Sequence, residues 1–429
     1  MQIPIETETL ANGLRVTYSE DHVAPLVAVN LWYHVGSANE REGRTGFAHL
    51  FEHMLFQGSA NVEANEHFEL VQRAGGTLNG STWLDRTNYY ETVPSNQLAI
   101  ALWLEADRMG SLLPAMTQQK LDTQRDVVKN ERRQGVENQP YGMVGDIAPP
   151  LMYPASHPYS WTVIGSMADL SAASLEDVKD FFRRYYAPNN ATIVVAGDVK
   201  ADSVRAIVRE YFSEIPRGPA IERPAPAPFT VRDTAVTLED RVQLARLYLN
   251  WHTVKATDAD APALQLAAYV LAGARTSRLT QDLVYSGEVA TTVQAYNDAK
   301  RLDGDFSIVA TARPGVALDT LQSLVDRNIQ RLATDGPTTA ELQQARNVIE
   351  AAFLRSIQTV SGKADQLNEY YYQSGNPDGF QDDLDRLQAV TTADIQRVVR
   401  KYLQAPRVMI SVVPQGKPAL AATKKQVTP

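Results

Sequence analysis

The stretch GFAHLFEHMLFQGS (residues 46–59) places His49 and His53 four positions apart, with Glu52 between them. On a helix, residues four apart have Cβ atoms about 5–6 Å from one another on one face, so two imidazoles can bind the same metal ion. Glu52 directly precedes His53, and its carboxylate can lie beside such an ion without coordinating it. A carboxylate placed there can take a proton from a metal-bound water, whose pKa zinc lowers to about 7. The spacing H-x-x-E-H is therefore typical of a catalytic zinc site.

Histidines also occur as structural residues, and a single histidine in this stretch would be explained that way. The chain has only seven histidines in 429 residues, so H-x-x-E-H arises by chance in fewer than about one chain in a hundred of this composition. The neighbouring residues are apolar, and an unpaired imidazole among them carries a desolvation cost: Phe47, Leu50, Phe51, Met54 and Leu55. We therefore expect a metal site here.

A catalytic zinc site usually has three protein ligands and one open position for water. The segment TQQKLDTQRDVVKNERRQ (117–134) predicts a polar helix with few apolar anchors, and Glu131 lies on it. Spacing alone does not favour Glu131 over Glu91 or Glu105. The chain has no cysteine, which excludes disulfides, thiolate catalysis and zinc bound by cysteine.

Composition indicates an ordinary globular protein, with 44% hydrophobic and 21% charged residues. The net charge of −9 argues against a nucleic acid or an anionic membrane surface as the main partner. No apolar run approaches the roughly 18–20 residues of a membrane helix. The first residues lack the pattern of a signal peptide. We expect a soluble protein, cytoplasmic or periplasmic, with the compartment left open.

The chain is long enough for two domains of about 200 residues each. The stretch PRGPAIERPAPAPF (216–229) has five prolines in fourteen residues and predicts an extended linker. We expect an N-terminal zinc-binding catalytic domain at 1–215 and a C-terminal domain without the metal motif at 230–413. Residues 414–429 have the composition of a flexible tail.

The two sides of the linker resemble each other. Residues 174–199 match 391–416 at an offset of 217, so that Asp177, for example, corresponds to Asp394. Each block predicts an amphipathic helix followed by a strand. A repeat of half the chain length indicates a duplicated domain rather than a solenoid, whose periods are about 20–50 residues. The predicted fold class is α+β, with two duplicated domains, each a mostly antiparallel sheet with helices packed on it.

Most of the first half alternates between strand and helix patterns. The patterns predict strands on both sides of the Asn12-Gly13 turn and at 27–35, a helix beginning near Thr45, a helix over 65–76, a strand pair over 77–93 and a helix over 95–111.

The opening motif and the segments that follow it resemble the M16 (pitrilysin-type, inverzincin) zinc metallopeptidases, the family of insulin-degrading enzyme and the mitochondrial processing peptidase. The similarity spans nearly the whole chain and includes GSANEREGRTGFAHLFEHMLFQGS (36–59), GGTLNGSTWLDRTNYY (75–90), QRDVVKNERRQ (124–134), HPYSWTVIG (157–165), YYAPNNATIVVAGDV (185–199) and TSRLTQDL (276–283). The resemblance implies that His49, His53 and Glu131 bind one zinc ion per chain. It also implies that Glu52 is the general base.

Two further features follow from the resemblance. The family tends to have a glutamate seven residues before the ligand glutamate, whereas this chain has Gln124, which hydrogen-bonds but carries no charge. Family members bind substrate as an added strand at a sheet edge beside the zinc. The matching edge is Asn79, Gly80, Ser81 and Thr82, which otherwise has the composition of a plain polar edge strand.

The second half has the pattern of a catalytically empty copy. Its positions equivalent to the ligand motif are Leu264, Ala267 and Ala268. Many family members carry an Arg and a Tyr in this half, seven residues apart, that hold substrate and stabilise the oxyanion. Here those positions are Val284 and Thr291, while Arg278 and Tyr285 share the spacing at another place in the pattern. The resemblance therefore implies a homologous partner subunit, in a heterodimer, that supplies the Arg–Tyr pair.

The function expected from these features is a zinc-dependent endopeptidase that hydrolyses peptides or oligopeptides. The alternative is a non-catalytic scaffold or assembly subunit of a processing-peptidase-like complex, which would have no chemical need for His49, Glu52, His53 and Glu131. A metal enzyme acting on a small molecule is disfavoured by the length and the duplication. Zinc is inferred from the ligand types, and cobalt or manganese can also occupy such a site.

Overall fold

A computed structural model describes residues 3–423, which form two compact units with interleaved sequences. The first unit comprises Met1–Gln134, Trp161–Pro224 and Phe353–Gln381, and the second comprises Gly135–Ser160, Ala225–Ala352 and Asp382–Pro429. Each unit therefore includes a segment from the other side of the linker predicted at 216–229. The linker residues form neither helix nor strand.

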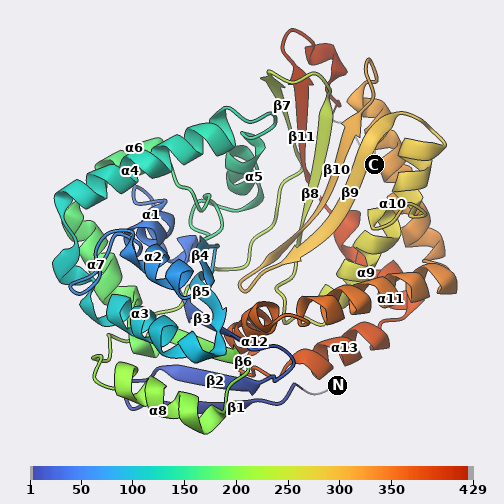
Figure 1. The fold of residues 1–429 in the computed structure, drawn as a ribbon. Helices are drawn as coiled ribbons and strands as arrows, with labels where there is room; N and C mark the ends of the chain where they lie inside the picture. Colours follow the sequence, from blue (N-terminus) through green and yellow to red (C-terminus); the bar gives the residue numbers. More distant parts are fainter. Residues whose placement is uncertain (1–2, 424–429) are drawn as a thin grey trace. The chain divides into compact units, whose positions relative to one another are not determined.

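The first unit contains a six-stranded sheet in the order β1-β2-β6-β3-β5-β4 (Figure 1). Strands β2 and β6 are parallel, and the other neighbours are antiparallel. The strands are β1 (Glu6–Thr9), β2 (Arg15–Glu20), β3 (Leu26–Tyr33), β4 (Thr77–Thr82), β5 (Thr87–Pro94) and β6 (Ala191–Gly197). Strand β6 is buried along its whole length, whereas β4 is the partly exposed strand at one end of the sheet.

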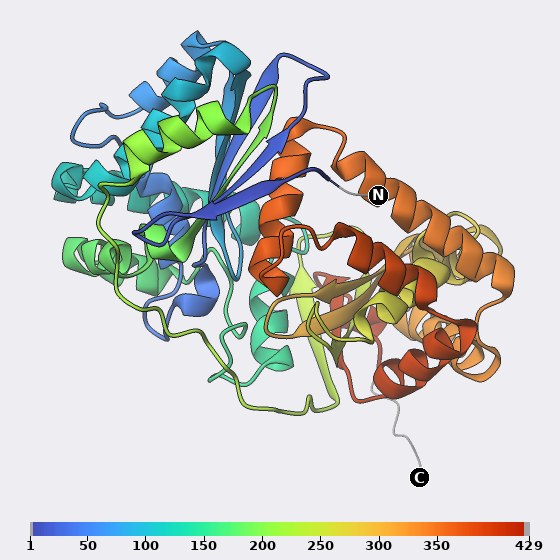
Figure 2. The same cartoon turned by 90° about the horizontal axis from the view of Figure 1, so that it is seen from below.

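The described part of the first unit also contains eight α-helices. They are α1 (Phe47–Met54), α2 (Glu66–Arg73), α3 (Leu98–Ser111), α4 (Gln118–Arg132), α6 (Met167–Ala172), α7 (Leu175–Tyr185), α8 (Ala201–Phe212) and α12 (Val360–Ser374). Figure 2 shows α12, drawn in orange, against strands from the beginning of the chain, and its closest neighbours are β3 and β6.

The second unit contains a five-stranded sheet in the order β7-β11-β8-β10-β9 (Figure 1). Its strands are β7 (Thr234–Asp240), β8 (Arg246–Thr253), β9 (Ala290–Ala299), β10 (Gly304–Ala312) and β11 (Val408–Pro414). Its helices are α5 (Val144–Met152), α9 (Ala261–Ala272), α10 (Leu318–Asp335), α11 (Thr339–Ser356), α13 (Phe380–Ala389) and α14 (Thr392–Val398), with one end of α11 and of α13 assigned to the first unit.

The two sheets share one topology, which confirms the predicted duplication. The order β2-β6-β3-β5-β4 in the first sheet repeats as β7-β11-β8-β10-β9 in the second, with the parallel pair in the same place. The helix before each central strand also begins alike. Ser174 with Asp177 and Thr391 with Asp394 both form a capping box, in which each side chain accepts a hydrogen bond from the other residue's backbone N–H.

The elements predicted in the first half are all present. The turn at Asn12-Gly13 joins β1 to β2, with Gly13 at a φ of 94°. The helix expected near Thr45 begins at Phe47, after Gly46 at a φ of 86°. Among residues 3–423, no helix is both long and apolar enough to cross a membrane.

The segment predicted as a tail begins within ordered structure. Residues Pro418–Leu420 form a 3-10 turn, and the backbone N–H of Ala422 donates to the Ser411 hydroxyl at 3.1 Å. Residues 424–429 of the predicted tail lie outside the described residues.

Candidate metal centre

Helix α1 is held in place by its apolar side and by its N-terminus. Phe47, Leu50, Phe51 and Met54 are at most 5% exposed in the core of the first unit. The carboxylate of Glu40 accepts hydrogen bonds from the backbone N–H groups of Gly46 (2.9 Å) and Ala48 (2.7 Å), two donors that a helix N-terminus leaves without intrahelical partners. The polar side of the helix, with the two histidines, is thereby fixed in orientation.

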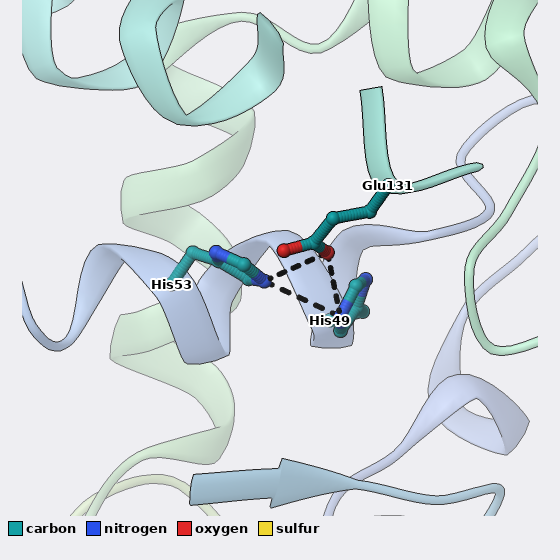
Figure 3. A group of neighbouring side chains, drawn as sticks. All are labelled: His49, His53 and Glu131. Atoms are coloured by element: carbon teal, nitrogen blue, oxygen red, sulfur yellow. Dashed lines mark hydrogen bonds and ion pairs between the residues drawn. The ribbon is translucent and has the colours of Figure 1, made fainter. Parts of the chain in front are cut away.

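The structure brings His49, His53 and Glu131 together (Figure 3). The two Nε2 atoms are 3.3 Å apart, and Glu131 Oε2 lies 3.3 Å from His53 Nε2 and 3.7 Å from His49 Nε2. Glu131 comes from α4, so the group joins two helices that are far apart in sequence. The side chains of His49 and His53 are 17% and 19% exposed, so the group is partly accessible to solvent.

This donor set fits a zinc ion. Ligand atoms about 2.0–2.1 Å from a tetrahedral ion lie about 3.4 Å from one another, close to the three separations observed. Metal binding also requires neutral imidazoles. Burial, and then the neighbouring His53, lower the pKa of His49 to about 4, so this side chain is neutral at physiological pH.

Glu52 lies beside the ligand triangle, and a residue of β4 fixes its carboxylate. Its Oε2 accepts a hydrogen bond from the Thr82 hydroxyl of β4 at 2.6 Å. Burial raises the pKa of Glu52, and the hydrogen bond from Thr82 opposes that rise. Sequence reasoning placed Thr82 at the substrate edge but missed this contact, which no local pattern signals.

The residues predicted to bind substrate lie on β4, the end strand of the first sheet. Gly80 faces α1 closely, because a Cβ atom there would lie 3.1 Å from Phe56 Cε2 and 3.3 Å from Glu52 Cγ. Asn79 is exposed, and its side chain accepts a hydrogen bond from the Gly80 N–H at 2.9 Å. The edge therefore runs directly beside the candidate general base.

Gln124 is on the same helix as Glu131 and is 7% exposed. Its role beside the metal stays a prediction.

Glu91 and Glu105, the other carboxylates that spacing left open, belong to a separate buried group with His67. Arg108 donates to both carboxylates, at 3.0 Å to Glu91, so a positive charge already lies where a cation would bind. All four side chains are at most 5% exposed. Of the two groups that could hold a metal among residues 3–423, only the first is free of such a charge.

The second unit has no counterpart of the ligand triangle at the equivalent helix. Leu264, Ala267 and Ala268 lie on α9 and are at most 4% exposed in the core of that unit. The guanidinium of Arg278 donates to both carboxylate oxygens of Glu341, at 2.7 and 2.8 Å. Tyr285 is 45% exposed, and the guanidinium carbon of Arg275 lies 4.6 Å from its ring centroid.

Two family models match the chain. Residues 15–146 match "Insulinase (Peptidase family M16)" and residues 172–349 match "Peptidase M16 inactive domain". "Zinc protease PqqE" of Helicobacter pylori is 30% identical over 406 residues, which are 93% of this chain and 90% of the relative. "Probable mitochondrial-processing peptidase subunit beta, mitochondrial" of Arabidopsis thaliana is 26% identical over 418 residues, covering 94% and 77% of the two chains. Among solved structures, a protease from Helicobacter pylori superposes with a TM-score of 0.88 at 28% identity, covering 96% of this chain and 100% of the other.

Proposed function

The chain belongs to peptidase family M16, and we propose that it is a zinc-dependent endopeptidase that hydrolyses peptides or oligopeptides. The observation that carries the proposal is the triangle of His49, His53 and Glu131, with Glu52 beside it and outside it. A scaffold protein has no chemical use for this arrangement. The names of relatives such as "Zinc protease PqqE" agree with it.

In this proposal His49, His53 and Glu131 hold the metal, one ion per chain. When bound, zinc supplies a Lewis acid that polarises a carbonyl and lowers the pKa of a coordinated water. Glu52 takes a proton from the attacking water and passes it to the leaving amine. Thr82 keeps the Glu52 carboxylate oriented for both transfers through its hydroxyl.

The substrate would add to β4 as a further strand, alongside Asn79, Gly80, Ser81 and Thr82. An end strand has backbone N–H and C=O groups without partners in the sheet, and an extended peptide can pair with them. The partly exposed pattern of β4 and its position beside Glu52 support this role. Gln124 would act behind Glu131 as a neutral group.

The Arg–Tyr pair would come from a homologous partner subunit, because the equivalent positions of this chain are Val284 and Thr291. This predicts weak peptidase activity for the chain alone and recovery when the partner is added. Full activity of a pure homo-oligomer would show that no partner is needed.

The test is Glu52→Gln, assayed with a quenched fluorescent peptide and by zinc content per chain, with and without the partner. Glu63→Gln, at an exposed glutamate, is the matched control. We expect Glu52→Gln to abolish hydrolysis while one zinc per chain remains bound. Zinc-free, inactive wild-type protein would contradict the proposal and favour the scaffold.

A further inference from the structure

The face of the first sheet opposite α1 carries a polar network centred on α12. Successive residues of a strand point to opposite faces. Tyr89 of β5 packs under Gly80 on the α1 side, and the next residue back, Asn88, donates to Asp365 of α12 at 3.4 Å. Asp365 also accepts hydrogen bonds from Asn30 (3.1 Å) and from the Trp32 indole (3.3 Å).

Arg86 joins this network to the substrate edge. Its Nη1 donates to the backbone carbonyl of Ser81 at 3.0 Å, to the Ser81 hydroxyl at 2.6 Å and to Asn88 Oδ1 at 3.2 Å. The Ser81 hydroxyl in turn donates to Asn88 Oδ1 at 2.7 Å. One guanidinium nitrogen therefore holds both the main chain and the side chain of Ser81.

The charge of Arg86 is balanced from α12. Burial lowers the pKa of its guanidinium, and the charges of Asp365 and Glu369 of α12 oppose this change most, followed by that of Glu52. The guanidinium carbon also lies 5.0 Å from the centroid of the Trp32 ring. Trp32 is 1% exposed, so this cation–π contact is largely desolvated and correspondingly strong.

We propose that Arg86, joined to α12 through Asn88 and Trp32, is the positioning residue for the substrate-binding edge of β4. Ser81 is followed directly by Thr82, whose hydroxyl holds Glu52. Contacts therefore lead from Asp365 of α12 through Asn88 to Arg86 and Ser81. Ser81 is the chain neighbour of the residue that holds the general base. The inference rests on the proposed function. Helix α12 follows the linker in the sequence but belongs to the first unit, so a segment from the second half of the chain supports the site.

The chemistry of arginine suits this task. A planar guanidinium can donate several hydrogen bonds in fixed directions while stacking on an aromatic ring, whereas a lysine ammonium keeps the charge and donor hydrogens but not the planar geometry. Arg86→Met removes the charge and all three hydrogen bonds, and Arg86→Lys keeps the charge and a donor group but loses the planar fork. Asp365→Asn removes one balancing charge with little change of shape.

The experiment compares these three variants with wild-type protein and with Arg73→Met, a control at an arginine that is 73% exposed on α2. KM and kcat are measured with a quenched fluorescent peptide in the presence of the partner, together with zinc per chain. Hydrogen–deuterium exchange of 77–82 and 47–54 is followed in the zinc-loaded protein. Exchange reports on the edge strand whether or not the chain is active.

For Arg86→Met we expect KM to rise about tenfold or more, because the strand that pairs with substrate loses hydrogen bonds from a charged donor. We expect kcat to stay within about threefold and zinc to stay bound, because Arg86 touches neither ligands nor reacting atoms. Exchange of 77–82 should accelerate while that of 47–54 does not. Arg86→Lys and Asp365→Asn should show smaller changes in the same direction.

A fall in kcat at constant KM, loss of zinc, or behaviour equal to that of Arg73→Met would overturn the inference. If the wild-type protein proves inactive but Arg86→Met still accelerates exchange of 77–82 alone, the proposed function fails and the positioning role stands. If exchange of that strand is unchanged, the positioning role fails irrespective of activity.

Discussion

The contact between Thr82 and Glu52 leads to a sharp prediction about pH. The Thr82 hydroxyl donates to Glu52 Oε2 at 2.6 Å and stabilises the ionised carboxylate against the effect of burial. Thr82→Val removes this donor and keeps nearly the same shape. A hydrogen bond to a charged group contributes about 1.5–3 kcal/mol, and one pKa unit corresponds to about 1.4 kcal/mol. The pKa of Glu52 should therefore rise by about one to two units.

A general base must be ionised to act, so a higher pKa moves the acidic limb of the rate profile to higher pH. The assay is kcat/KM of the zinc-loaded protein on a quenched fluorescent peptide between about pH 5 and 9. Thr82→Ser, which keeps a hydroxyl, is the matched control and should retain the wild-type limb. At high pH, where Glu52 is ionised in every form, the rates should converge. An equal loss at every pH, or a Ser variant that behaves like the Val variant, would refute the reasoning.

Three further predictions follow from other contacts. Glu131→Gln should lower zinc affinity, measured by competition with a chelator, by about 100-fold or more, because an anionic ligand is lost. The control Glu63→Gln should leave the affinity unchanged. Equal zinc affinities of the Glu131→Gln variant and the wild-type protein would exclude Glu131 as a ligand. Burial opposes ionisation of Asp303, but hydrogen bonds from His157 and His252 outweigh it and lower its pKa to about 2. The ionised Asp303 carboxylate stabilises the fold above its unfolded pKa near 4, and this stabilisation is lost as pH falls to about 2. Asp303→Asn should therefore lower the free energy of unfolding, measured with denaturant, by about 2 kcal/mol at pH 7 and by almost nothing near pH 2. A loss of stability that does not depend on pH would contradict this. A fragment ending at Pro224 lacks α12, which packs on β3 and β6. This fragment should not unfold cooperatively unless a peptide of residues 353–381 is added. Cooperative unfolding of the fragment without that peptide would contradict the packing argument.

The motif on α1 shows what the local spacing of residues can predict and what it cannot. The four-residue interval of His49 and His53 is a property of any helix, so their shared face could be predicted without knowing the fold. Spacing alone could not favour Glu131 over Glu91 and Glu105, because the three carboxylates differ in where their elements pack; the resemblance to the family made that choice. Arg108 lies between Glu91 and Glu105 in the folded chain and excludes a cation there.

Other elements resisted prediction for similar reasons. Helix α5 contains Pro149 and Pro150, residues that disfavour a helix interior, and it packs against β8 and β11 of the second unit. Helix α12 has no sequence feature that assigns it to the first sheet. Its Asn368 side chain donates to the backbone carbonyl of Asn30, 338 positions away in the chain.

The sequence by itself therefore determined what short-range geometry controls: the helix with the metal motif, the strands around their turns and the duplicated helix–strand blocks. It also indicated the family through the order of its motifs. Only the tertiary structure decided which hydroxyl holds Glu52 and which late helix packs on the first sheet. These choices depend on which surfaces and charges are buried together when distant segments pack, and no local spacing encodes that pairing.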